Sequence, residues 1–497
     1  MRLRHIFSLL LPSLALFLSM CSPSVPSDFK AVSDTVSIYP DYADITIPSN
    51  IAPLNFKILS EADDYVVHAH PKGQDGLVVK GPVAQFDVDK WHGLLEQCVG
   101  DTLLIDVYAK ADGQWLRHPA MRLAVAEEID PYISYRQIEP SYIGFEEMRI
   151  CQRDLRSFDE EEVFNNCLTS EDENGQCINC HSYQDYNRQG NMQMHVRINH
   201  GGTVIVRDGK AVKVDLKTPQ TISAGVYPSW HPTLPLIAYS NNTTTQNFHE
   251  NHPNKVEVQD GQSDIILYDV ENNKVQIIEN SPTELESFPY WSPDGRTLYY
   301  VSAAIPYLAS DSAVTEYKAT HYRDYKYNIY KKSFDPETRQ FGPTDTVFMA
   351  SSHGASATFP RVSPDGKYLM FTLAPYGTFH IWHKDADLFL MDLATGGIRP
   401  MKEINSKDVD SYHSFSSNGR WVIFSTRRDD GSYTRLYLTH FGPDGHCTKP
   451  FILPQRAPAH NPLLYKYYNI PEFMVAPVSL SRQALMDVVA SDPIPAQ

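Results

Sequence analysis

The residues best suited to chemistry form one short run, Gln176 to His181, in which two residues separate Cys177 from Cys180 and His181 follows at once. This C-x-x-C-H pattern is the signature of c-type haem attachment. Each thiol would add across one haem vinyl group, and the adjacent histidine would ligate the iron. The spacing therefore predicts one covalent haem c with His181 as a metal ligand. Two alternatives stay open, a structural zinc site with Cys167 as a further ligand and a dithiol–disulfide pair.

The second axial ligand of such a haem is expected just after the motif, where Met192, Met194 and His195 lie close together. We favour His195, because the alternating residues that follow would point its side chain to one defined side, and Met194 or Met192 is the alternative. A methionine ligand would raise the reduction potential relative to two histidines. Arg197 would be placed to pair with a haem propionate. Core packing explains the two methionines equally well, and an open sixth position is a further alternative.

The N-terminus has the features of an export signal. Residues 1–20 begin with basic side chains and continue as an apolar run that is too short to span a membrane. The run ends at Leu18-Ser19-Met20-Cys21, which resembles a bacterial lipobox, so we predict lipidation of Cys21 and a tether over residues 21–38. The net charge of −17 argues against nucleic acid or an anionic lipid surface as a partner. Membrane contact is expected through the lipid only.

Two regions lie between this leader and the main body of the chain. Residues 39–138 alternate short apolar runs with polar turns, which predicts a β-sandwich domain. His68, His70 and His92 in this domain suggest a metal site, but histidines on an exposed strand face are more often solvated, and we expect that here. Residues 139–200 are predicted to form a connector that carries the haem segment, with a short helix over 157–164.

Repetition dominates residues 201–475. An aromatic residue followed by proline, two further residues and a Ser-Pro-Asp-Gly turn recurs in full or in part, with copies that begin at Tyr227, Phe288, Phe359 and Tyr412. Four strands per copy indicate a β-propeller, and the flanking segments bring the expected number of blades to six. The long connections between second and third strands should share one face, which we expect to be the functional one. A tail over 476–497 follows, with a helix expected within it.

The repeat resembles the propeller units of the TolB family. In combination with the Cys-x-x-Cys-His-Ser run, the methionine-rich turn, His195-Val196-Arg197 and His200-Gly201-Gly202-Thr203, it looks like a family of gram-negative envelope lipoproteins that carry a cytochrome c-type motif. The resemblance implies haem binding and no known reaction. The expected fold is all-β: a β-sandwich, a short haem-binding linker and a TolB-like (WD40-like) β-propeller.

These patterns predict a lipoprotein of the periplasm, anchored to the outer membrane, that uses its haem in electron transfer or redox sensing with a protein docked on the propeller loop face. The alternative is a non-catalytic scaffold of the cell envelope in which the motif is structural and holds haem or zinc. An enzyme, such as a hydrolase or peroxidase, is the weakest hypothesis, because no phosphate-binding glycine-rich loop occurs.

The remaining cysteines and histidines leave further alternatives. Four cysteines outside the motif and the leader either pair as disulfides or stay as buried thiols: Cys98, Cys151, Cys167 and Cys447. Several histidines of the propeller region suggest a second metal site or a docking surface, although loop histidines are usually solvated: His249, His252, His321, His380, His383 and His413.

Overall fold

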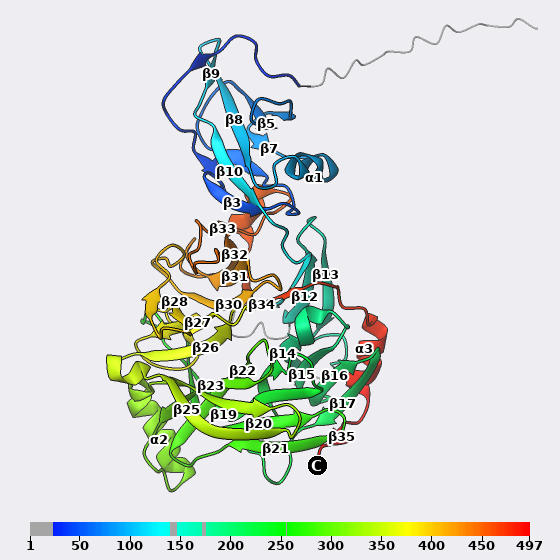
Figure 1. Cartoon of the computed structure of the whole chain (residues 1–497), viewed down its shortest axis with the longest axis vertical. Helices are drawn as coiled ribbons and strands as arrows, with labels where there is room; N and C mark the ends of the chain where they lie inside the picture. Colours follow the sequence, from blue (N-terminus) through cyan, green and yellow to red (C-terminus); the bar gives the residue numbers. More distant parts are fainter. Residues whose placement is uncertain (1–22, 140–146, 171–174, 255) are drawn as a thin grey trace, which may run out of the picture.

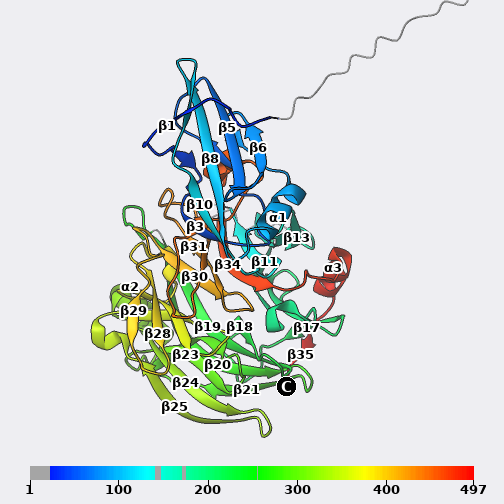
Figure 2. The same ribbon diagram turned by 45° about the horizontal axis from the view of Figure 1, so that its top comes forward.

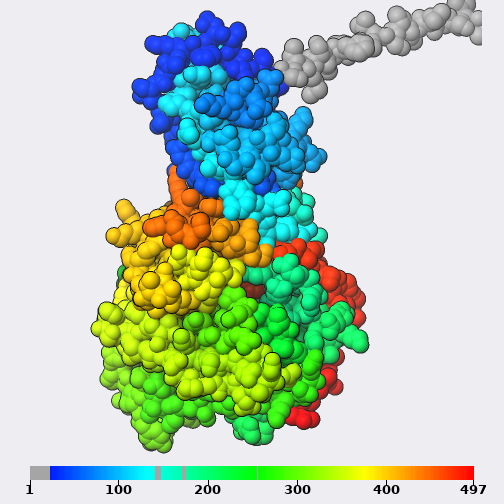
Figure 3. All heavy atoms as spheres, viewed as in Figure 1, coloured from blue at the N-terminus to red at the C-terminus, as the bar shows by residue number. Residues whose placement is uncertain are grey.

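The computed structural model describes residues 23–139, 147–170, 175–254 and 256–497. The chain forms two lobes, a smaller N-terminal lobe that stands on a larger lobe made of the rest of the chain (Figures 1 and 3). The predicted signal peptide, residues 1–20, and the predicted lipidation site, Cys21, lie outside the described residues. Within the described part of the chain, no helix is long and apolar enough to cross a membrane.

The N-terminal lobe consists of a seven-stranded sheet, a three-stranded sheet and one helix. The large sheet contains β1 (Lys30–Ala31), β3 (Ile45–Pro48), β5 (Asp64–Pro71), β6 (Leu77–Lys80), β8 (Thr102–Ala111), β9 (Gln114–Arg117) and β10 (Met121–Ala126). The small sheet contains β2 (Ile38–Tyr39), β4 (Phe56–Ile58) and β7 (Val83–Ala84), and the helix is α1 (Val88–Glu96). Because β1 and β2 pair within these sheets, residues 30–39 are not part of a free tether, contrary to the prediction for 21–38.

Six sheets of four or five strands make up the large lobe. The first two contain β11 (Tyr132–Ile138), β12 (Arg149–Asp154), β13 (Glu160–Asn165) and β34 (Tyr467–Met474), then β14 (Gln176–Tyr183), β15 (Met192–Ile198), β16 (Gly202–Arg207), β17 (Lys210–Asp215) and β35 (Ile494–Pro495). The next two contain β18 (Val226–Trp230), β19 (Leu236–Phe248), β20 (Val256–Asp269) and β21 (Lys274–Glu279), then β22 (Glu284–Trp291), β23 (Thr297–Ala304), β24 (Asn328–Asp335) and β25 (Gln340–Phe348). The last two contain β26 (Ser356–Val362), β27 (Tyr368–Ala374), β28 (Asp387–Asp392) and β29 (Ile398–Pro400), then β30 (Asp410–Phe415), β31 (Trp421–Thr426), β32 (Arg435–His440) and β33 (Phe451–Ile452).

The sheets of the large lobe form a β-propeller, and the apolar pattern of its strands explains why the sheets pack face to face. In β23, Leu298 and Tyr300 enter one apolar cluster while Tyr299 and Val301 enter another, so both faces of the strand are buried. Such strands read as continuous apolar runs, because each sheet lies between two others. One strand from each sheet lines the common axis: β34, β14, β18, β22, β26 and β30.

The ends of the chain close the ring, and this corrects the predicted domain boundaries. The late strand β34 pairs antiparallel with β11, so the first sheet joins the two ends of the propeller region. We had assigned residues 132–138 to the β-sandwich domain, which was wrong because their partner strands belong to the propeller. The tail contributes α3 (Arg482–Ala490), which was predicted, and β35, which pairs with β17.

The predicted connector over 139–200 is also wrong for its described part. Strands β12, β13, β14 and β15 fill it, so the C-x-x-C-H motif lies within the propeller and not between two domains. The acidic run expected as a helix over 157–164 forms β13 instead, because pairing with β12 places Glu162 near the guanidinium of Arg149, with 3.7 Å between the charged groups. Tertiary pairing here outweighs the helix-like local sequence.

Long connections follow the second strand of several sheets, as predicted. They include the extended hairpin of β19 and β20, helix α2 (Asp311–His321) between β23 and β24, and the 3-10 turn His380–Trp382 between β27 and β28. Figure 2 shows α2 at the margin of the large lobe, away from the N-terminal lobe. Other single-turn 3-10 segments are Gln184–Asn187, Tyr322–Asp324, Ala350–His353 and Pro458–Leu463.

One apolar cluster extends from the N-terminal lobe into the last propeller sheet, where it includes the fully buried Trp421. The indole nitrogen of Trp421 donates to the carbonyl of Glu127 at 3.3 Å, and the backbone nitrogen of Ser417 donates to Asp130 at 2.6 Å. The two lobes are therefore joined by shared core as well as by polar contacts, and we expect them to unfold together.

A buried ion pair in the last sheet gives a first prediction. Asp410 is fully buried and accepts hydrogen bonds from the Arg428 guanidinium and from the backbone nitrogen of Ser406, both at 2.6 Å. Arg428→Met leaves this carboxylate buried without its cation, so we expect the free energy of unfolding to fall by about 3 kcal/mol. Urea unfolding followed by circular dichroism measures the loss.

The matched control is Arg420→Met. It removes a partly exposed guanidinium that lies 3.6 Å from the carboxylate of Glu127. Pairs of this kind contribute at most about 1 kcal/mol. Equal losses in the two variants would show that the buried pair has no special role.

Candidate functional site

The six strands that line the propeller axis share one local distortion. Each contains a bulge in its pairing with the next strand, and each bulge contains a residue with positive φ. These residues, with their φ angles, are Cys180 (48°), Tyr227 (49°), Phe288 (49°), Phe359 (53°), Tyr412 (49°) and Ile470 (52°). Positive φ is uncommon in residues other than glycine and indicates a strained backbone. The same strained conformation therefore recurs at equivalent positions in all six axial strands.

The second half of the C-x-x-C-H motif is one of these bulges. Cys180 occupies the position held by an aromatic residue or isoleucine in the other sheets, and His181 occupies the position of proline in most of them: Pro228, Pro289, Pro360, His413 and Pro471. The motif therefore belongs to the repeat. The signal that could have revealed this is Ser182-Tyr183, which matches Ser229-Trp230 at the same distance from the bulge.

Cys180 and His181 line a small cavity on the axis, with a volume of about 40 Å³. Each of the six axial strands contributes to the wall of this cavity. Besides Cys180 and His181, the wall contains Tyr227, Pro228, Phe288, Pro289, Phe359, Arg361, Tyr412, Ile470 and Glu472. A cavity of this size holds one or a few water molecules. The thiol of Cys180 is thus enclosed by aromatic rings, and burial raises its pKa above the usual value.

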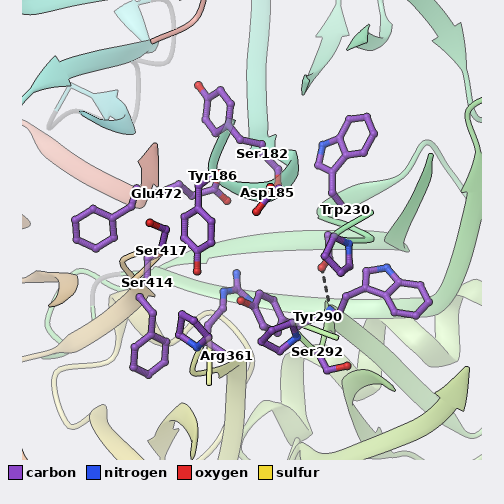
Figure 4. Close-up of a pocket in the computed structure, with 18 of the residues that line it drawn as sticks. Ser182, Asp185, Tyr186, Trp230, Tyr290, Ser292, Arg361, Ser414, Ser417 and Glu472 are labelled. Carbon is purple, nitrogen blue, oxygen red and sulfur yellow. Dashed lines mark hydrogen bonds between the residues drawn. The ribbon is translucent and has the colours of Figure 1, made fainter. Parts of the chain in front are cut away.

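A wider funnel of about 310 Å³ adjoins this cavity along the axis (Figure 4). The two spaces share Pro228, Arg361 and Glu472 in their walls. The guanidinium of Arg361 lies 4.5 Å from the centre of the Tyr290 ring, and burial lowers the pKa of Arg361. Burial also raises the pKa of Glu472 to about 8, although the charge of Arg361 opposes this shift. The funnel therefore offers aromatic walls and two arginine cations, Arg188 and Arg361, to a ligand of moderate size.

His181 is the least satisfied polar side chain of the site. Its side chain is 1% exposed, and among the described residues neither ring nitrogen has a hydrogen-bond partner. Burial lowers the pKa of His181 to about 3, and the charge of Arg136 adds to this effect while the Ile470 backbone opposes it. The imidazole is therefore neutral at physiological pH, which is the form that ligates a metal.

Cys177 lies three residues earlier on β14 and is partly exposed. It is paired in register with Arg197 of β15, whose guanidinium donates to the Cys177 sulfur at 3.9 Å. The next pair on the same side is Asn179 with His195. Cys177, His195 and Arg197 therefore occupy one face of the second sheet.

His195 is 3% exposed, and its Nδ1 lies 3.3 Å from the hydroxyl of Thr203. Burial lowers the pKa of His195 to about 3. Met192 and Met194 point to the opposite face of β15, where both are buried in the apolar cluster that contains Ile178. This arrangement favours His195 over either methionine as a ligand near the motif.

The donor chemistry of the site fits an attached haem, because two thiols and a neutral, unpartnered imidazole lie on one strand. The spacing of the thiols fits less well. A residue of extended strand rises about 3.3 Å, so Cys177 and Cys180 are separated by up to about 10 Å along β14. Attachment of both thiols to one haem would require this strand to bend and the axial cavity to widen.

The alternatives raised for the cysteines can be placed as well. The six described cysteines form no disulfide, and Cys98, Cys151 and Cys447 are buried thiols while Cys167 is exposed. In the described part of the chain, one group of three potential metal ligands comes together within 4.8 Å, and it does not include the motif. A zinc site at Cys177, Cys180 and His181 is therefore not preassembled.

The histidines of the propeller region also have defined positions. His383 is buried, and its Nε2 lies 3.0 Å from a carboxylate oxygen of the buried Glu257, on the face with the long connections. His249 is more exposed and lies 3.9 Å from the other oxygen of Glu257. His380 is bonded to Thr358 and the Gly377 carbonyl. His413 lies on the axial strand β30 and follows Tyr412, the positive-φ residue of that strand. Its Nε2 lies 3.0 Å from the Met370 carbonyl oxygen.

No protein-family model matches the chain, and no curated protein matches it. Among solved structures, TolB from Acinetobacter baumannii is similar over 82% of both chains, with 13% identity and a TM-score of 0.44. The β-propeller domain of the trilobed protease from Pyrococcus furiosus is similar over 78% of this chain and 97% of its own, with 11% identity and a TM-score of 0.33.

Proposed function

We propose that this chain is a haem-binding lipoprotein of the bacterial envelope, in which a six-bladed, TolB-like propeller carries one covalent haem c at its axis. An N-terminal β-sandwich packs on the propeller, and the lipid on Cys21 anchors the protein to the outer membrane on the periplasmic side. The function is electron transfer or redox sensing with a protein partner that docks on the face of the long connections.

The observation that carries this proposal is the state of His181, which is buried beside Cys180 with both ring nitrogens unpartnered in the described structure. A buried polar group without a partner costs about 1–3 kcal/mol, so a ligand that bonds to it would stabilise the protein. Cys177 and Cys180 would hold the haem covalently, and His181 and His195 would ligate its iron. Arg197 would pair with a propionate.

When bound, the haem supplies one-electron redox chemistry. The contribution of the protein is to surround it with the aromatic walls of the axial cavity and the funnel. Exclusion of water by such walls and two histidine ligands would set a lower reduction potential than a methionine ligand.

The haem proposal is tested by the spectrum of the purified protein. We expect protein produced in a host with cytochrome c maturation to give a pyridine haemochrome spectrum and a haem-stained band after denaturing electrophoresis. Cys177→Ser with Cys180→Ser should lose both signals completely, whereas Cys98→Ser with Cys447→Ser, which changes two buried thiols elsewhere, should keep them. A wild-type protein without covalent haem would refute the proposal.

A second candidate function is a scaffold of the cell envelope in which the motif is structural. The observation that favours it is the equivalence of Cys180-His181 with the other five axial bulges, since a repeat position needs no cofactor. In that case the propeller face alone binds the partner. Replacing Cys180 and His181 with the aromatic-proline pair found in other sheets would then leave partner binding unchanged.

A further inference from the structure

A second group of side chains that could bind a metal ion lies in the N-terminal lobe. Its residues are far in the sequence from those that line the propeller axis. Along β5, Tyr65, Val67 and Ala69 enter the core, so His68 and His70 project from the other face of the sheet. Asp106 on β8 is the direct cross-strand partner of His68. Strand register thus brings three side chains of metal-binding types, two histidines and one aspartate, to one patch.

The three side chains are close enough to share one ion. One ligand atom from each of His68, His70 and Asp106 lies within 4.8 Å of the other two. Nε2 of His70 is 3.2 Å from Oδ2 of Asp106, and the two imidazole rings stack with their centres 4.2 Å apart. The side chains of His70 and Asp106 are only 13% and 12% exposed. Two histidines and one carboxylate are a recurrent ligand set for divalent transition metals.

The positions of the protons point to a cation between these groups. Nδ1 of His70 lies 2.8 Å from the carbonyl oxygen of Pro71, which can only accept, so Nδ1 carries a proton. Nε2 then has a lone pair in a neutral ring, yet it faces the carboxylate of Asp106, which also only accepts when it is ionised. Two arrangements would join these groups: a second proton on His70, which makes an imidazolium–aspartate ion pair, or a metal ion bound by both side chains.

A metal ion explains more of the arrangement than a proton does. A histidine that binds a metal usually donates its other N–H to a backbone carbonyl, as His70 does to Pro71. A proton would link His70 to Asp106 and leave the stacked His68 without a role.

We propose that His68, His70 and Asp106 bind a divalent transition-metal ion, with Zn²⁺ as the best-matched probe. With three protein ligands, the ion would keep one coordination position for water or another ligand. Gly76, in the connection between β5 and β6, packs directly against His70. A Cβ atom at position 76 would lie 2.6 Å from the Cβ of His70. A side chain at position 76 would therefore displace the ligand.

Calorimetric titration of the full-length chain without an affinity tag tests the site. All variants carry Cys177→Ser, Cys180→Ser and His181→Ala, so that the axial motif cannot bind the metal. We expect this background to bind one equivalent of Zn²⁺, and expect His70→Ala or Asp106→Asn to weaken binding at least tenfold. The control is His118→Ala, because this partly exposed histidine of the same lobe forms a hydrogen bond with the Asp34 carbonyl and lies outside the proposed ligand group.

Unchanged Zn²⁺ binding in His70→Ala and Asp106→Asn, or no binding in the background protein, would overturn the proposal. If a variant fails to fold, Co²⁺ added to the background protein decides the question. A spectrum with two imidazole ligands and no sulfur ligand supports the site, and a spectrum of hydrated Co²⁺ refutes it.

Discussion

Replacing Cys180 with tyrosine and His181 with proline is expected to abolish covalent haem completely while the propeller stays folded. The double variant gives β14 the pair found at Tyr227-Pro228 in the next sheet, where tyrosine adopts a φ of 49° in the equivalent bulge. Tyrosine suits this backbone but is much larger than cysteine, so we expect overpacking to lower the free energy of unfolding by about 1–3 kcal/mol.

The measurement combines the pyridine haemochrome assay with thermal unfolding followed by circular dichroism. The control is His413→Pro, which makes the same exchange at the matching position of the last sheet and should leave the haem signal intact. Haem retention in the Cys180→Tyr, His181→Pro variant would exclude Cys180 as an attachment site. Equal partner binding, together with a wild-type protein that carries no haem, would establish the scaffold function.

The sequence predicted the propeller from the four sheets that carry the aromatic-proline and Asp-Gly signature. It indicated the first two sheets only by fragments, namely the closing segment that forms β34 and the hairpin of β16 and β17. In the first sheet, the axial strand β34 comes from the far end of the chain and pairs with β11. Local patterns contain no information on pairing between segments so distant. In the second sheet, Cys180 and His181 replace the residues that define the repeat, so the motif concealed the strand that contains it.

The chemistry was predictable only as a list of residues. C-x-x-C-H identifies Cys177, Cys180 and His181, but the pattern implies a loop or helix, whereas the structure has a strand in a closed ring. The repeat accounts for Cys180 and His181, and it does not account for Cys177. The repeat leaves Cys177 unexplained, and this residue adds to the imidazole of His181, unpartnered among the described residues, as support for haem attachment.

The proposed metal ligands of the N-terminal lobe could also be predicted only in part from the sequence. His68 and His70 are two residues apart on one strand, so alternation alone places them together. Their third partner depends on the register between β5 and β8, which selects Asp106 and leaves out His92 on helix α1. A one-residue shift of that register would have turned Asp106 to the other face of the sheet.

The stability of the protein is expected to fall as the pH rises from 5 to 9, with Glu286 as a principal cause. Glu286 on β22 is 3% exposed, and within the described structure its Oε2 has no hydrogen-bond partner. Burial raises the pKa of Glu286 from 4.5 to about 8, and the neighbouring Asp264 adds to the shift. The folded state therefore holds a proton that the unfolded state releases at lower pH.

The sign of the effect follows from this difference. Below pH 4.5 the Glu286 carboxyl is protonated in both states, and it does not change the balance between them. Between pH 4.5 and about 8 only the unfolded state ionises, so each pH unit favours unfolding by about 1.4 kcal/mol. Above about pH 8 the full destabilisation is present, about 5 kcal/mol.

Glu286→Gln removes the ionisation and keeps the shape of the side chain. We expect this variant to match the wild type at pH 4 and to exceed its free energy of unfolding by about 5 kcal/mol at pH 9. Urea unfolding at several pH values measures both curves, with Glu337→Gln in an exposed turn as the control. Parallel curves for Glu286→Gln and the wild type would show that Glu286 ionises normally. A smaller slope remains in the variant, because the pKa of Glu472 is also raised to about 8 by burial.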